Sequence, residues 1–135
     1  MTESSAVFDA SVFVRALADE QEDAADWIRR AERGRVVVSV PVITDFEIAN
    51  ALAGYVRGGG LTLAGAVLRL EFAQGVPRRV RTDAEIAAAA LGVALERGLS
   101  VYDATYAVLA EAERALLVTA DAALAAATER AELLP

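Results

Sequence analysis

The uninterrupted run Val36-Val37-Val38-Ser39-Val40 constrains the fold of this chain more than any other segment. A β-branched run without polar alternation is typical of a strand that is buried on both faces of a parallel sheet. Shorter apolar runs at residues 6–8 and 115–118 are predicted as further strands, residues 79–81 as a short one, and residues 99–102 as a lead into Asp103.

Helices are predicted between these strands, because apolar residues recur there at helical spacing. The expected ranges are 12–17, 20–33, 41–57, 61–74, 83–98, 104–114 and 122–130, with 41–57 and 61–74 paired as a hairpin. Strands that alternate with helices predict an α/β fold with a parallel sheet covered on both faces. With 135 residues, 56% of them apolar, we expect one domain over residues 1–135.

The residue types that the chain lacks exclude several kinds of site. Without Cys or His there is no thiolate or imidazole zinc site, no Cys nucleophile and no Ser-His-Asp triad. All 13 basic residues are arginine, which excludes Schiff-base chemistry and a phosphate loop with its lysine. Any metal must be held by oxygen, which favours a hard cation such as Mg²⁺ or Mn²⁺.

The charge balance bears on the partners that the chain can have. A net charge of −7 argues against broad electrostatic capture of nucleic acid, since Lys and Arg normally dominate that affinity. This objection weakens if several acids form one metal site. The apolar run at residues 86–95 is about half of the ~20 residues that a bilayer requires. Residues 1–5 lack the basic flank and apolar stretch of a secretory signal, so we expect no membrane span and a cytoplasmic protein.

Three aspartates occupy equivalent places in the predicted fold. Asp9, Asp103 and Asp121 are each expected where a strand passes into a helix, and the carboxyl ends of parallel strands meet at one edge of a sheet. The alternative is that each is only a helix N-cap, a role for which Asp is well suited. Three such acids in so short a chain favour a shared site.

A fourth acid is expected on the helix at 41–57. Glu47 shares a face with small or apolar side chains and with Asn50, and an ionised carboxylate there is costly unless it is paired or bound to metal. Asp45 is the competitor, but two residues of helix turn it about 200° away. Periodicity alone does not choose between the two acids, and the alternative for Glu47 is a solvated surface acid.

These residues stand in four segments that resemble a known family. The segments are Phe8-Asp9-Ala10-Ser11, Thr44-Asp45-Phe46-Glu47-Ile48-Ala49-Asn50-Ala51-Leu52, Tyr102-Asp103-Ala104-Thr105-Tyr106-Ala107-Val108-Leu109-Ala110 and Leu117-Val118-Thr119-Ala120-Asp121. In this order and spacing they resemble the successive acidic motifs of PIN domains, above all of the VapC toxins of bacterial and archaeal toxin–antitoxin pairs. The match spans nearly the whole chain.

The resemblance implies a three-layer α/β/α PIN-like fold with a central, mostly parallel sheet. It selects Glu47 over Asp45, because the family's glutamate precedes a hydrophobic-x-Asn-x-Leu pattern. It also implies that divalent metal is bound mainly by Asp9 and Asp103, with Asp121 in the outer part of the site, often acting through water. The expected catalytic and metal-binding residues are therefore Asp9, Glu47, Asp103 and Asp121.

Four further residues are candidates for supporting roles. Thr119 matches the family's Thr/Ser-x-Asp pattern and is expected to bind an acid or a water. Ser11 has three candidate roles: the cap of the first helix, a partner of a site carboxylate or water, and a substrate contact. Arg15 is a candidate phosphate contact or an ordinary surface arginine. Asn50 is a candidate to orient Glu47, three residues away on the same helix face.

The function expected from these residues is metal-assisted hydrolysis of RNA, leaving a 5′-phosphate and a 3′-hydroxyl as the resemblance implies. Mg²⁺ is the expected ion, with Mn²⁺ as the alternative. A VapB-type antitoxin is the expected partner, able to insert an arginine into the acidic pocket, and a homodimer is expected through the helices between residues 41 and 74. Tyr102 and Tyr106 are expected in the core or in an interface.

Three other functions compete with this one. A phosphatase of the haloacid-dehalogenase type requires a second Asp where Ser11 stands and a later lysine, both of which are lacking. A protein-binding module without catalysis would use the acids as caps and surface charge. A PIN nuclease that is not a toxin would share the site but lack the antitoxin.

Overall fold

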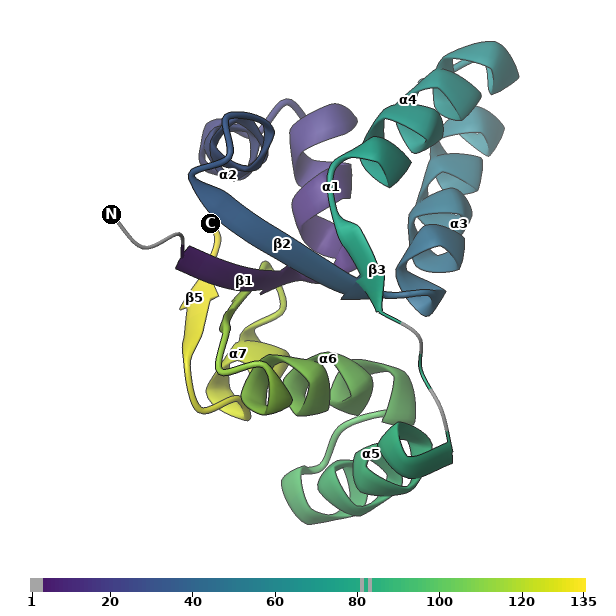
Figure 1. Ribbon diagram of the computed structural model, residues 1–135. Coiled ribbons are helices and arrows are strands. Elements are labelled where there is room, and N and C mark those ends of the chain that lie inside the picture. Colours follow the sequence, from purple (N-terminus) through teal and green to yellow (C-terminus); the bar gives the residue numbers. More distant parts are fainter. Residues whose placement is uncertain (1–3, 81, 83) are drawn as a thin grey trace.

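The structure, a computed structural model, describes residues 4–80, 82 and 84–135 of the chain. Its strands form one sheet in the order β3-β2-β1-β4-β5, and each neighbouring pair is parallel. They are β1 (Ser4–Phe8), β2 (Val36–Pro41), β3 (Arg78–Val80), β4 (Leu116–Thr119) and β5 (Ala131–Leu133). The predicted parallel sheet is confirmed (Figure 1). Arg81 of the predicted short strand and Asp83, the expected start of a helix, lie outside the described residues.

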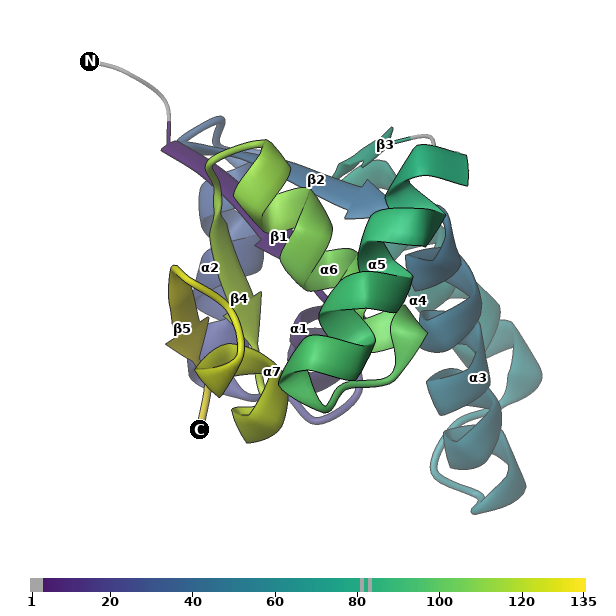
Figure 2. The same cartoon turned by 90° about the horizontal axis from the view of Figure 1, so that it is seen from below.

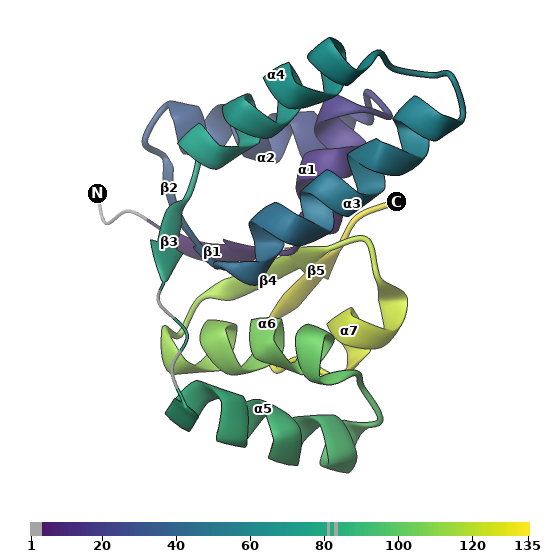
Figure 3. The ribbon, with the colours of Figure 1, turned by 90° about the vertical axis from the view of Figure 1, so that its right-hand side faces the viewer.

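Helices cover the two faces of this sheet and complete the three-layer α/β/α fold (Figure 3). One face carries α1 (Ala10–Leu17), α2 (Glu22–Glu32), α3 (Ile43–Arg57) and α4 (Leu63–Gly75). The other face carries α5 (Ala84–Arg97), α6 (Val101–Ala112) and α7 (Ala122–Ala126). Seen from below, α6 lies against the sheet and α5 packs beside α6 (Figure 2). The expected hairpin is also present, since α3 contacts α4.

The central strand β1 is apolar at successive positions because its side chains enter two different cores. Phe8 points toward α1 and α2, where the rings of Phe13 and Trp27 meet it edge-on at centroid distances of 5.8 and 5.9 Å. Val7 points the opposite way, into a cluster that includes Tyr106 of α6. Alternation of side chains between the faces of a sheet thus explains why both kinds of position are apolar.

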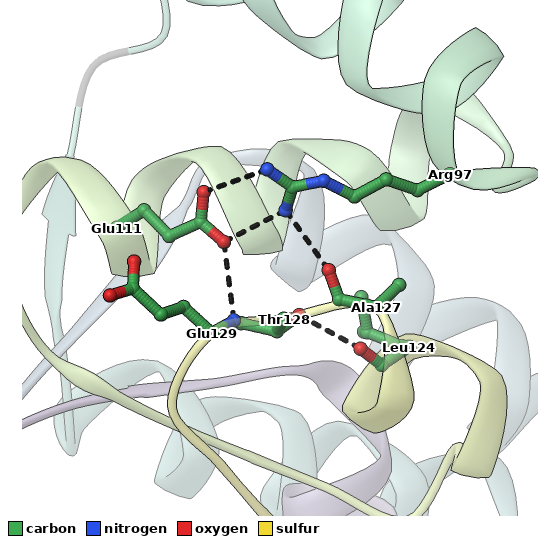
Figure 4. A network of polar contacts seen from close by, with 6 residues as sticks. All are labelled: Arg97, Glu111, Leu124, Ala127, Thr128 and Glu129. Atoms are coloured by element: carbon green, nitrogen blue, oxygen red, sulfur yellow. Dashed lines mark hydrogen bonds and ion pairs between the residues drawn. The ribbon is translucent and has the colours of Figure 1, made fainter.

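A network of polar contacts ties the helices of the second face together (Figure 4). Arg97, the last residue of α5, donates to both carboxylate oxygens of Glu111 on α6, at 2.8 and 3.2 Å. It also donates to the carbonyl of Ala127, the C-cap residue of α7, at 2.9 Å. The network fixes α5 although that helix packs on α6 instead of on the sheet.

Two expectations for the second half of the chain are wrong. Residues 99–102 form no strand: α5 ends before Gly98, whose φ is +70°, and Ser100 caps α6 by accepting a hydrogen bond from the backbone of Asp103. Asp103 therefore lies in the first turn of a helix that follows another helix. The helix expected over 122–130 ends at Ala126, and β5 follows it as the outermost strand, beside β4. None of the helices in the described residues is long and apolar enough to cross a membrane.

Candidate metal-dependent active site

The fold brings the four predicted acids to one edge of the sheet from four different elements. Asp9 follows β1 and Asp121 follows β4, the strand next to β1, so both lie at the carboxyl ends of paired strands. Glu47 comes from α3 on one face and Asp103 from the start of α6 on the other. We call these four residues the carboxylate cluster.

Asp9 is the most buried acid of the cluster, with 7% of its surface exposed. Its carboxylate accepts hydrogen bonds from the backbone and hydroxyl of Ser11 and from the hydroxyl of Thr119, the last at 2.6 Å. Burial raises the pKa of Asp9, these hydrogen bonds lower it, and the charge of Asp121 raises it further. The net effect is a raised pKa, so the ionised form of Asp9 is costly in the absence of a nearby cation.

Two hydroxyls join the ends of the neighbouring strands around Asp9. Ser11 donates to Asp9 and accepts from the backbone N–H of Ala120 at 2.9 Å. Thr119 donates to Asp9 and accepts from the backbone N–H of Asp121 at 3.0 Å. Asp9, and not Ser11, is the N-cap of α1, so the candidate cap role of Ser11 is wrong and its contact with a carboxylate is what the structure shows.

Asp121 and Asp103 lie at helix starts, where backbone N–H groups favour negative charge. One oxygen of Asp121 caps α7 by accepting from the backbone of Ala123 and Leu124 at 2.9 and 3.2 Å. Asp103 is partly buried, and burial, followed by the charge of Asp121, raises its pKa. The capping role that competed with a shared site is therefore real for Asp9 and Asp121, yet their charges still act on neighbouring acids.

The two acids of α3 have different partners. Asp45 pairs with Arg79 of β3, which donates to it at 2.8 and 2.9 Å. Glu47 instead accepts a hydrogen bond from the hydroxyl of Tyr106 at 2.5 Å. Burial raises the pKa of Glu47, the Tyr106 hydrogen bond lowers it, and the charges of the cluster's Asp103 and Asp9 raise it. Glu47 is thus the α3 acid that lies with the cluster.

The cluster has the donor chemistry of a site for a hard cation, because all of its side-chain ligands are carboxylate oxygens. In the described part of the chain, no ion pair with an arginine involves any of the four acids. As the side chains stand, however, the described residues contain no group of three or more acids placed to hold a metal ion.

A cleft of about 630 Å³ opens beside Glu47. Asn50 lines this cleft, but among the described hydrogen bonds none joins it to Glu47. Phe46 and Tyr102 also line it and are 70% and 61% exposed. Of the two positions expected for Tyr102, core or interface, the core position is therefore wrong and the interface position stays a prediction. The remaining lining residues are Ala10, Ser11, Val14, Ile43 and Ala51.

Among the described hydrogen bonds and ion pairs, none joins Arg15 to any of the four acids. Arg15 stands in the last turn of α1. The hydrogen bond to Asp19 is the main cause of the raised pKa of Tyr55, and the charge of Arg15 offsets part of that rise. Arg15 is therefore near enough to α3 for its charge to act on Tyr55.

The sequence did not lead us to predict Tyr106 and Thr44 as partners of the site acids. Tyr106, expected in the core, is indeed 1% exposed, but its hydroxyl contacts Glu47 and lies 2.9 Å from the hydroxyl of Thr44. The spacing held a signal: Thr44 precedes Glu47 by three residues and Tyr106 follows Asp103 by three, which places each pair on one helix face.

Comparison with known proteins agrees with the fold. The PIN domain family matches residues 6–129. The structure of PAE2754 from Pyrobaculum aerophilum is 31% identical, covers 97% of this chain and 91% of its own, and superposes with a TM-score of 0.77. No curated protein sequence matches.

Two more distant structures share the fold. VapBC2 from Rickettsia felis, bound to a DNA fragment from its promoter, is 14% identical over 97% of this chain and 99% of that one, with a TM-score of 0.73. VapC20 from Mycobacterium tuberculosis, a toxin that cleaves the sarcin-ricin loop, is 18% identical over 96% and 99%, with a TM-score of 0.67.

Proposed function

Because this chain belongs to the PIN domain family, we propose that it is a metal-dependent endoribonuclease and the VapC-type toxin of a toxin–antitoxin pair. The observation that carries the proposal is the carboxylate cluster: acids from four elements share one edge of the sheet, and the pKa values of three of them are raised partly by each other's charges. Such repulsion persists in a folded protein when a bound cation offsets it.

The residues of the cluster divide into inner and outer groups. Asp9 and Asp103 are the proposed main ligands, with Glu47 completing the inner group and Asp121 the outer one. A divalent ion held there, Mg²⁺ or Mn²⁺, supplies an activated water and positive charge beside the phosphate. Ser11 and Thr119 hold the carboxylate of Asp9 in one orientation, which keeps its oxygens directed for binding.

Unpaired RNA is the proposed substrate. The exposed rings of Phe46 and Tyr102 stand in the same cleft as Glu47, and bases that are not paired stack on such rings irrespective of sequence. Stacking matters here because a chain with a net charge of −7 gains little from general attraction of phosphates. Hydrolysis leaves a 5′-phosphate and a 3′-hydroxyl. Since RNA is the substrate, we place the activity in the cytoplasm.

The proposed protein partners are an antitoxin and a second copy of the chain. An arginine of the antitoxin has a binding place at the carboxylate cluster, which lacks a described arginine partner of its own. For the homodimer, α3 and α4 offer an apolar groove of about 340 Å³ that includes Leu63, which is 70% exposed. Leu68, on the same helix but outside the groove lining, is 66% exposed.

The test compares the purified wild type with Asp103→Asn on single-stranded RNA, with and without Mg²⁺ or Mn²⁺. We expect new 5′-phosphate ends only with the wild type and only with the ion, and a matching growth arrest when the wild type alone is expressed in a foreign host. Equal cleavage by Asp103→Asn, or cleavage by the wild type in EDTA, contradicts the proposal.

A further inference from the structure

The hydroxyl of Tyr106 links the two helices that bring acids to the cluster from opposite faces of the sheet. Tyr106 stands on α6, yet its hydroxyl lies 2.5 Å from a Glu47 oxygen and 2.9 Å from the hydroxyl of Thr44, both on α3. Tyr106 and Thr44 are each 1% exposed. A buried tyrosine hydroxyl must find polar partners, and here both partners belong to the helix that carries a site acid.

The number of protons fixes the direction of this chain of hydrogen bonds. An ionised carboxylate only accepts, so Tyr106 gives its single hydroxyl proton to Glu47. The hydroxyl of Thr44 must then donate to the oxygen of Tyr106. Burial raises the pKa of Tyr106, which keeps the hydroxyl protonated and able to donate. Thr44, Tyr106 and Glu47 therefore form one directed chain of donors.

We propose that Tyr106, held by Thr44, is a positioning residue that fixes one oxygen of Glu47 and leaves the other for a cation shared with Asp9 and Asp103. Without this bond, the like charges of Asp9 and Asp103 push a half-buried, flexible glutamate toward the open cleft. The inference rests on the proposed metal-dependent function and names the residues that prepare Glu47 for it.

The test is Mn²⁺ binding, measured by calorimetric titration of the protein without RNA. Removing a partner that orients a metal ligand typically weakens metal affinity about 10- to 100-fold, and we expect Tyr106→Phe to do so. The matched control is Tyr55→Phe, which also removes a tyrosine hydroxyl that donates to a carboxylate, that of Asp19, and which should bind Mn²⁺ like the wild type.

Two further comparisons separate positioning from packing. In a Glu47→Gln background, Tyr106→Phe should cause no additional loss of Mn²⁺ affinity, because the ionised carboxylate on which it acts is gone. Thr44→Ser, which keeps the hydroxyl, should bind like the wild type, whereas Thr44→Val should weaken binding in the same direction as Tyr106→Phe but less.

The outcomes distinguish this inference from the proposed function. If the wild type binds no Mn²⁺, the proposed function fails and the inference fails with it. If the wild type binds Mn²⁺ and Tyr106→Phe binds equally well, only the inference is overturned. The inference is also overturned if Tyr106→Phe costs as much affinity with Gln at position 47 as with Glu, because the effect then comes from packing.

Discussion

Arg79 clasps Asp45 with two parallel hydrogen bonds, from Nε at 2.8 Å and from Nη2 at 2.9 Å. This pair ties β3 to the first turn of α3, and both side chains are less than one-third exposed. It gives Asp45 a structural partner and leaves Glu47, half a helical turn away, to the carboxylate cluster.

The structural role of Asp45 and the metal-binding role of Glu47 can be tested by changing each acid in turn. Asp45→Asn should lower the free energy of unfolding by about 1.5–3 kcal/mol, the range for a hydrogen bond to a charged group, and leave Mn²⁺ affinity unchanged. Glu47→Gln should weaken Mn²⁺ binding with little loss of stability. Urea unfolding and calorimetric titration test the two variants side by side; a loss of Mn²⁺ affinity in Asp45→Asn would refute the assignment.

Mn²⁺ should stabilise the folded wild type, because an ion that binds only the folded state shifts the unfolding equilibrium. At about 100 times its dissociation constant, the gain is about 2.7 kcal/mol. Asp9→Asn should lose most of this gain. The control is Asp26→Asn, on the exposed side of α2, where Asp26 pairs with Arg30 at 3.3 Å. Thermal unfolding with and without the ion decides the matter, and an equal rise for Asp9→Asn would count against the site.

The raised pKa values predict how stability without metal depends on pH. The pKa values of Asp9, Glu47 and Asp103 lie above their usual values in the folded chain, chiefly because of burial. Between the usual and the raised pKa, the folded state holds more protons than the unfolded state, so these groups cost stability as pH rises through that window. Their stabilising effect is present at lower pH and lost above the raised values.

Asp9→Asn isolates one of these groups. In EDTA, the free energy of unfolding of Asp9→Asn relative to the wild type should increase as pH rises from about 4 toward neutrality, because Asn does not ionise. Urea unfolding at a series of pH values measures the difference. A difference that is constant, or that shrinks with pH, would show that the pKa of Asp9 is not raised.

The two exposed rings at the cleft should contribute to RNA binding. Each base stacked on a ring is worth about 1–3 kcal/mol, so Phe46→Ala and Tyr102→Ala should each weaken binding by about 5- to 150-fold. Fluorescence anisotropy with a short single-stranded RNA, in the Asp103→Asn background in which we expect no cleavage, measures this. Leu95→Ala is the control, since Leu95 is 79% exposed and lies outside the cleft. Equal weakening by the control would contradict a role in stacking.

The positions of Asp9 and Asp121 could be predicted because they follow local patterns. Each follows a short apolar run, and such runs are typical of strands in a parallel sheet whose two faces are both covered by helices. Parallel pairing then brings the carboxyl ends of the strands to the same edge, whatever their separation in the sequence. The kind of metal ligand could be predicted from composition, since a chain without His, Cys or Lys has only oxygen ligands to offer.

Asp103 shows where local patterns fail. The four residues before it are mostly apolar, and so short a run is compatible with a strand or with the start of a helix. The outcome depends on the cap that Ser100 provides and on the packing of α5 against α6, which no local window contains. Asp103 therefore reaches the expected edge of the sheet from the first turn of α6 and not from the end of a strand.

Tyr106 shows a different limit. Its apolar neighbours on α6 correctly predict a buried ring, but the partner of its hydroxyl lies 59 positions away on another helix. That contact exists only because α3 and α6 approach from opposite faces at the same edge of the sheet. The arrangement of layers, and not the helix pattern, determines which acid the hydroxyl meets.

The pairing of β1 with β4 delays assembly of the site during synthesis. Asp9 leaves the ribosome early, while the Thr119 that binds it follows 110 residues later. At translation rates of about 5–20 residues per second, the wait is about 5 to 20 s. A growing chain therefore carries an incomplete carboxylate cluster until the segment through Asp121 has been made and β4 has paired with β1.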